Sequence, residues 1–75
     1  MHIDREIDAR GLNCPLPLMK AKKTLAEMQS GQVMRLTATD SGSMKDFMTF
    51  ATQTGHQMIE QKNLGREYIH VLRCR

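Results

Sequence analysis

Hydrophobic and polar positions divide the chain into six segments, each bounded by polar turn residues. In residues 3–9 the apolar side chains fall on part of an alternating face, which predicts a first strand. Apolar residues then recur at spacings of three and four, while lysines and a glutamate fall on the opposite side; the apolar ones are Leu18, Ala21, Leu25 and Met28. This pattern predicts an amphipathic helix that ends near Ser30-Gly31.

The middle of the chain repeats the order of strand and helix. From Gln32 to Thr39 the residues alternate between two faces, and the β-branched residues among them favour a strand. Ser43 and Asp46 have the spacing of a capping box, so we expect them to begin a second helix that ends at Gly55. Its buried stripe is expected to comprise Met44, Phe47, Met48 and Ala51.

Two more strands are predicted at the end of the chain, over Gln57–Lys62 and Glu67–Arg73, with a hairpin turn at Asn63–Arg66. Strands separated by helices require right-handed parallel crossovers, and a terminal hairpin adds antiparallel pairing. The pattern therefore predicts an α/β fold in the order βαβαββ.

The length of the chain limits what it can do. With 75 residues it is expected to form one domain, spanning residues 1–75. A domain of this size buries only about 60% of the surface that its unfolded chain exposes. Because so small a core leaves no room for a ligand pocket, we expect chemistry on the outer surface.

The segment Gly11-Leu12-Asn13-Cys14-Pro15-Leu16-Pro17 places a cysteine directly before a helix that a proline begins. The positive end of a helix favours a thiolate, and it can lower the pKa of a cysteine from about 8.5 to roughly 3.5–7.5. Gly11, Asn13, Pro15 and Pro17 indicate a stiff surface loop. Since prolines lack N–H groups, the amides of Leu16, Leu18 and Met19 are left to face the sulfur, and the activation is expected to be moderate. The alternative is that Cys14 is a small buried apolar residue.

This motif resembles that of the TusA/SirA family of small sulfur-transfer proteins. The resemblance extends along nearly the whole chain, through the acidic-ended strand before the motif, the lysine-rich helix after it, Gly31, Asp40, Gly55-His56 and Tyr68. It implies a two-layer α/β sandwich with a four-stranded mixed sheet and both helices on one face. It also implies that Cys14 carries sulfur as a persulfide, and that the partners are cysteine desulfurases, rhodaneses or DsrE-type proteins in tRNA thiolation or sulfur oxidation.

Topology predicts the neighbours of the cysteine. If the first two strands are parallel, then Cys14, Asp40 and Ser43 share one edge of the sheet, where sites of α/β proteins gather. Asp40 is either a docking residue for a cation on a partner or an ordinary turn residue at a strand end. Arg10 and Lys20 are candidates for partner docking, and the alternative for the lysines of this helix is a solvated face.

The cysteines and histidines of the chain do not indicate a metal site. The spacings of the three histidines and two cysteines match no zinc motif, so we expect no metal and no cofactor other than sulfur carried on Cys14. A disulfide to Cys74 needs Cα atoms within about 7 Å, and we expect Cys74 to be a residue of the last strand without a chemical role. The methionines are interpreted as core-filling residues.

The cellular setting follows from composition. Two cysteines, no basic and apolar leader and no apolar run of about 20 residues predict a cytoplasmic protein outside the membrane. The net charge of +3 suits acidic proteins or weak nucleic-acid contact. With three aromatic residues there is little for a base-stacking surface, so direct nucleic-acid binding is disfavoured.

The sequence therefore predicts a sulfur carrier, a sulfurtransferase in the broad sense, with Cys14 as its reactive residue. Two other classes stay open. One is a regulatory or adaptor module, which would keep its function without the Cys14 thiol. The other is a small nucleic-acid binder, whose affinity would depend on salt and on the lysines of the first helix.

Overall fold

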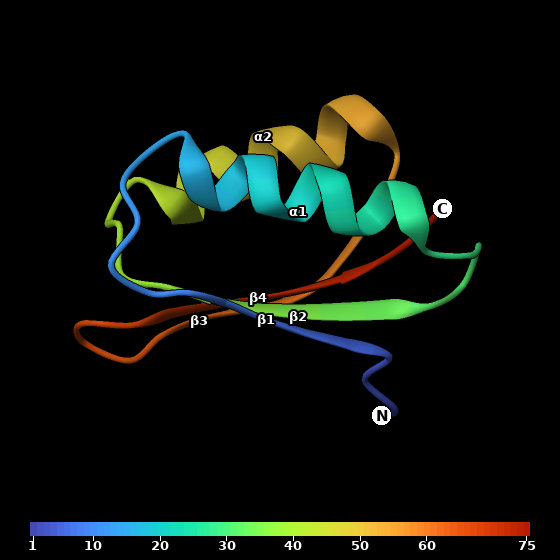
Figure 1. Ribbon diagram of the computed structural model, residues 1–75, viewed down its shortest axis with the longest axis horizontal. Helices are drawn as coiled ribbons and strands as arrows, with labels where there is room; N and C mark the ends of the chain where they lie inside the picture. Colours follow the sequence, from blue (N-terminus) through green and yellow to red (C-terminus); the bar gives the residue numbers. More distant parts are fainter.

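The computed structural model describes residues 1–75 as a two-layer sandwich, with two helices covering one face of a four-stranded sheet (Figure 1). The elements are β1 (Arg5–Ala9), α1 (Leu16–Glu27), β2 (Val33–Ala38), α2 (Ser43–Thr54), β3 (Gln57–Asn63) and β4 (Tyr68–Arg73). The strand order is β1-β2-β4-β3, in which β1 and β2 are parallel and β4 is antiparallel to both of its neighbours. The predicted fold class is confirmed.

The first strand and the first helix differ most from the prediction, and the bounds of the other three strands differ by one residue at one or both ends. The first strand begins at Arg5, and α1 ends at Glu27 with Met28 in an extended conformation. The helix does not reach Ser30-Gly31 because the following residues form other hydrogen bonds. The amide of Gln29 donates to the Gln32 side chain at 2.9 Å, and the amide of Gly31 donates to the Cys74 carbonyl at 2.8 Å.

The core lies between the sheet and the helices. In β2 the residues that face the helices are fully buried, and they are Met34, Leu36 and Ala38. Alanines stand on both layers, at Ala9, Ala21, Ala38 and Ala51, and their small side chains let the helices pack closely on the strands. Of the predicted stripe of α2, Phe47 and Ala51 are buried, but Met48 is 47% exposed because it lies on the outer side of the helix.

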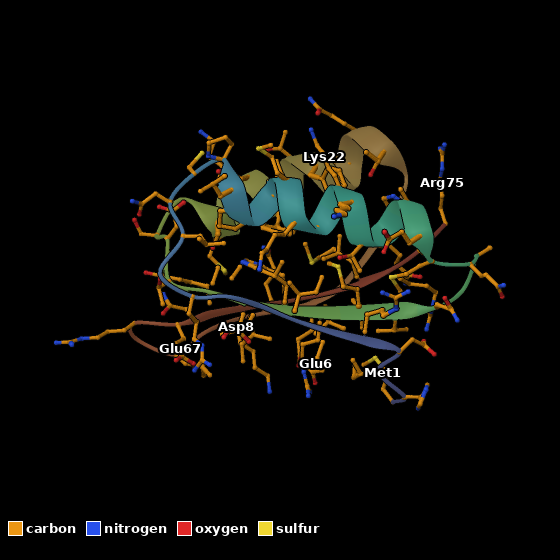
Figure 2. All side chains as sticks on the ribbon, viewed as in Figure 1. Met1, Glu6, Asp8, Lys22, Glu67 and Arg75 are labelled. Atoms are coloured by element: carbon orange, nitrogen blue, oxygen red, sulfur yellow. The ribbon has the colours of Figure 1, made fainter.

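The other face of the sheet is open and carries paired charges. Glu6 of β1 pairs with Arg35 of β2, and Asp8 pairs with Arg10, which also contacts Glu67. Figure 2 shows the labelled side chains of Glu6, Asp8 and Glu67 on the side of the sheet away from the helices. Because each of these charges has a partner and meets solvent, this face is a solvated surface.

The start of α2 is not the predicted capping box. Gly42 is the N-cap residue, and no side chain caps the helix. Ser43 is the first helical residue and is only 2% exposed, because its hydroxyl turns inward to the sheet and not back to the helix amides. There Ser43 Oγ lies 3.0 Å from Nε2 of His70 in β4.

His70 is the fully buried polar residue at the centre of this contact. The side-chain Nε2 of Gln61 donates to His70 Nδ1 at 3.1 Å and to the carbonyl of Met44 at 2.8 Å. Since Nδ1 accepts, the ring proton is on Nε2 and is donated to Ser43 Oγ. The ring also stacks on Phe47, with the centroids 4.3 Å apart and the planes 4° from parallel.

We predict that the neutral His70 makes the fold sensitive to acid. Burial lowers the pKa of His70 from 6.5 to about 4. Between these values the unfolded chain binds a proton that the folded protein does not, so stability is full above about pH 6.5 and falls as the pH decreases toward 4. The expected loss of unfolding free energy is about 1–3 kcal/mol between pH 7 and pH 4.5, measured by urea denaturation.

The matched variant is His70→Phe, which keeps an aromatic ring beside Phe47 and cannot titrate. Asp8, whose pKa is lowered to about 2, loses its contribution only below this window. His56, whose pKa burial also lowers, remains in both proteins. A variant that loses as much stability as the wild type over this window would disprove the role of His70.

Candidate functional site

The candidate site lies at the edge of the sheet where β1 and β2 end and both helices begin (Figure 1). This arrangement follows from the parallel pairing of the two strands, since each is followed by a helix that starts at its carboxyl end. A small hollow at this edge is lined by Cys14, Asp40, Ser43, Asp46 and neighbouring side chains, with no room for a bound small molecule. The structure thus brings together the three residues that topology placed at one edge.

The loop before the cysteine is tied to the second strand. Gly11 has a φ of +80°, a conformation in which a side chain would be strained. Its amide donates to Thr39 Oγ1 at 2.9 Å, just beyond the end of β2. The hydrogen bond fixes the β1–α1 loop beside the β2–α2 loop, so the cysteine is presented from a defined place.

The prolines are placed differently from the prediction. Pro15 is the N-cap residue and Leu16 is the first helical residue, so Pro15 does not occupy the first helical position. The amide of Leu16 donates to the Asn13 carbonyl at 2.9 Å, and that of Met19 donates to the Pro15 carbonyl at 3.0 Å. Two of the three amides expected to face the sulfur therefore have other acceptors. Pro17 is buried and forms part of the hollow.

Cys14 is exposed and free, but its surroundings do not activate it. Its thiol donates a hydrogen bond to Asp46 Oδ2 at 3.4 Å. This hydrogen bond, with desolvation and the negative charges of Asp46 and Asp40, raises the pKa of Cys14 above its ordinary value. The expectation of a lowered pKa is wrong, because the Asp46 carboxylate is hydrogen-bonded to the thiol and two of the three amides expected to face the sulfur have other acceptors.

Asp46 is the functional neighbour that the sequence interpretation missed. The capping-box pattern predicts that Asp46 caps the helix, whereas its carboxylate reaches across from α2 to the sulfur. A signal for it was present, since Asp46 stands in the first turn of a helix that was predicted to begin at the same edge as Cys14. Negative residues are favoured in a first turn, so the helix supports the charge that opposes the thiolate.

The proposed docking cations have partners within the chain. Arg10 pairs with Asp8 and Glu67, and Lys20 Nζ donates to the Asp8 carbonyl at 3.1 Å. Beside them, on the outer side of α1 and the Cys14 loop, lies a group of surface residues that we call the α1 patch: Leu12, Leu16, Met19, Lys20 and Lys23. Leu16 is 46% exposed and Met19 is 55% exposed, so two large apolar side chains meet solvent in the first turn of the helix that follows Cys14.

The thiol and the two carboxylates are the only cluster with metal-ligand geometry. One ligand atom from each of Cys14, Asp40 and Asp46 lies within 4.8 Å of the others. This set mixes one sulfur with two carboxylates, and it matches neither the cysteine and histidine sets of structural zinc sites nor the all-oxygen sets of Mg²⁺ and Ca²⁺. The geometry is better described as a protonated thiol held by carboxylates.

Cys74 lies apart from this site. It is buried, and its sulfur is 3.6 Å from the carbonyl of Leu25, near the end of α1. Both cysteines are free thiols. Only the thiol of Cys14 is exposed for exchange with another molecule.

Comparison with known proteins identifies the family. The profile of the family described as Sulfurtransferase TusA matches residues 5–74. The sulfur carrier protein TusA of Allochromatium vinosum is 57% identical over 65 residues, which span 87% of this chain and 86% of that protein. The chain belongs to the TusA family.

Two further relatives match this chain along most of its length. The putative sulfur carrier protein YrkI of Bacillus subtilis is 38% identical over 65 residues, or 87% of each chain. The crystal structure of the SirA-like protein from Desulfitobacterium hafniense matches with a TM-score of 0.81 and 28% identity, covering 92% of this chain and 95% of that one.

Neither α1 nor α2 has the length and apolar character needed to cross a membrane.

We predict that Asp46→Asn lowers the pKa of Cys14. The substitution removes the negative charge beside the sulfur and keeps a similar shape, so more thiolate is present at pH 7. The rate of iodoacetamide alkylation, followed by intact mass as a function of pH, should show a midpoint at lower pH than in the wild type. The control is Asp40→Asn, whose carboxylate makes the smaller contribution and should shift the midpoint less. An unchanged midpoint in Asp46→Asn would refute this role of the carboxylate.

Proposed function

We propose that this chain is a sulfur carrier that accepts sulfane sulfur on Cys14 as a persulfide and relays it to a cysteine of another protein. The observation that supports the proposal most directly is the exposed, free Cys14 thiol in the motif of a TusA-family chain. The absence of room for a small molecule beside the sulfur fits a reaction between two protein surfaces.

The proposed loading step is a thiol exchange. After Cys14 gives its proton to solvent, its thiolate attacks the outer sulfur of a persulfide on the donor protein. A bond forms between Cys14 Sγ and that sulfur, the sulfur–sulfur bond of the donor breaks, and the donor cysteine leaves as a thiolate. The product is Cys14–S–SH, and nothing is oxidised or reduced overall. Delivery is the same exchange, in which the thiolate of an acceptor attacks the outer sulfur.

Asp46 restrains this chemistry in the free protein. Because the carboxylate favours the protonated thiol, little thiolate is available at neutral pH. Exchange and oxidation both proceed through the thiolate, so a protonated Cys14 is slow to react with unintended partners. The carrier is therefore expected to react mainly within complexes that hold a donor or acceptor sulfur against it.

The partners in this proposal are protein cysteines with sulfur to give or receive. Cysteine desulfurases, rhodaneses and DsrE-type proteins are the classes that the family suggests, in tRNA thiolation or sulfur oxidation, within the reducing cytoplasm. The α1 patch is the proposed docking surface, because Leu16 and Met19 expose apolar area at the start of the helix that follows Cys14 and Lys23 adds positive charge. It fits a partner with an apolar surface bordered by acidic residues. No cofactor is proposed besides the covalent sulfur.

Sulfur loading tests the central claim. After incubation with a cysteine desulfurase and cysteine, wild type and Cys74→Ala should gain about 32 Da in intact mass, while Cys14→Ser should gain nothing. The reason is that Cys74 is buried and Cys14 alone is accessible. Equal loading of Cys14→Ser would refute the proposal. An adaptor function would instead survive in Cys14→Ser, so a partner pathway that runs normally with this variant favours the adaptor alternative.

A charge placed in the α1 patch should slow transfer without changing the thiol. In Met19→Asp the carboxylate interrupts the apolar surface and opposes acidic partner residues, so we expect transfer to fall by about tenfold or more, equivalent to a loss near 1.4 kcal/mol. The measurement is the rate of sulfur transfer from a persulfidated desulfurase. Met48→Asp is the matched control, since Met48 is 47% exposed on the other helix. Equal slowing in both variants would show that the α1 patch is not the docking surface.

A further inference from the structure

Residues buried beneath the site hold the helix that carries Asp46. The first turn of α2 has no side-chain cap, and its hydrogen bonds to the sheet come from His70 and Gln61. His70 donates to Ser43 Oγ at 3.0 Å, and Gln61 donates to the Met44 carbonyl at 2.8 Å. These contacts fix the first two residues of the helix to neighbouring strands β4 and β3.

The contacts of His70 bracket Asp46 along the helix. Ser43 lies three residues before Asp46, and Phe47, on which the His70 ring stacks, lies one residue after it. Ser43 and Phe47 also line the hollow that contains the Cys14 sulfur. The His70 ring therefore contacts a residue that precedes Asp46 and a residue that follows it, and the Asp46 carboxylate is the one that reaches the sulfur.

We propose that His70 is a positioning residue that holds the Asp46 carboxylate against the Cys14 thiol through Ser43 and Phe47. The stack on Phe47 sets the depth of the helix above the sheet, while the hydrogen bond to Ser43 sets its position along and around its axis. The Sγ–Oδ2 distance is 3.4 Å, and a hydrogen bond weakens as its distance and angle depart from their preferred values, so a shift of the helix weakens this contact. The inference deepens the proposed function, because it names what sets the protonation of the carrier thiol.

His70 influences the thiol indirectly, through the position of the Asp46 carboxylate. Without the ring nitrogens of His70, the first turn of α2 is held by apolar packing and by Gln61, which then lacks its acceptor on the ring. The Asp46 carboxylate then spends less time beside the sulfur, and the thiolate of Cys14 is less opposed. A merely structural histidine would change stability and leave the thiol as it is.

The test compares alkylation of Cys14 at pH 7 with the free energy of unfolding. His70→Phe keeps a ring beside Phe47 and removes both nitrogen contacts, while Ser43→Ala removes the same hydrogen bond from the other side. We expect both variants to react with iodoacetamide several-fold faster than the wild type, with the midpoint of the rate at lower pH. The control is Met28→Ala, a core substitution near the end of α1, which should destabilise the fold and leave the alkylation rate unchanged.

The same substitution made in the Asp46→Asn variant shows whether His70 acts through Asp46. In Asp46→Asn, the further change His70→Phe should add nothing to the alkylation rate, because the charge that it positions is absent. Wild-type alkylation rates in both Ser43→Ala and His70→Phe would overturn the proposal. It would also be overturned if His70→Phe raised the alkylation rate of Asp46→Asn by the same factor as it raises that of the wild type. If His70→Phe does not fold, Ser43→Ala alone decides. Since iodoacetamide requires no sulfur partner, failure of sulfur loading in the wild type would refute the proposed function and leave this result standing.

Discussion

The parallel pairing of β1 and β2 is the constraint on which the site depends. Arg5 pairs with Met34 and Ala9 with Ala38, so the two strands run side by side and end at one edge. Each is followed by a helix on the same face, and both helices therefore start where the strands end. Without this pairing, Cys14 and Asp46 would have no reason to meet, because 32 positions separate them along the chain. The hydrogen bond from Gly11 to Thr39 completes the arrangement by joining the two loops.

Two opposed electrostatic influences act on the sulfur at this edge. The start of a helix provides roughly half a positive charge, spread over several amides, and it is worth about 0.3–1 kcal/mol at an exposed position. A carboxylate in hydrogen-bond contact provides a full negative charge at one point. Here the prolines and the internal acceptors leave few amides for Cys14, while Asp46 contacts it directly. The carboxylate is therefore the stronger influence, and the thiol is favoured over the thiolate.

The sequence predicts the elements well where one periodicity governs a whole segment. The alternation in β2 and the helical spacing in α1 each report burial on one face, and the structure buries Met34, Leu36 and Leu25 accordingly. Family resemblance added the arrangement of the two layers and the persulfide role expected of Cys14, which the local motif alone already singled out as reactive. Local chemistry was less predictable: Ser43 and Asp46 match a capping box, yet each has a stronger partner from another element. A short motif describes only the residues within it, and a contact across 27 or 32 positions is set by topology and side-chain reach.

The placement of a polar cluster in so small a core has a physical explanation. An apolar residue in place of His70 would bury surface equally well, and it would not lose stability in acid. Apolar packing, however, is non-directional, and it allows a helix to shift or rotate by small amounts without much loss. The hydrogen bonds of Ser43, His70 and Gln61 have preferred distances and angles, so they define one position for the start of α2. A site that relies on a 3.4 Å contact between a loop cysteine and a carboxylate on the first turn of α2 needs that defined position more than it needs additional buried apolar area.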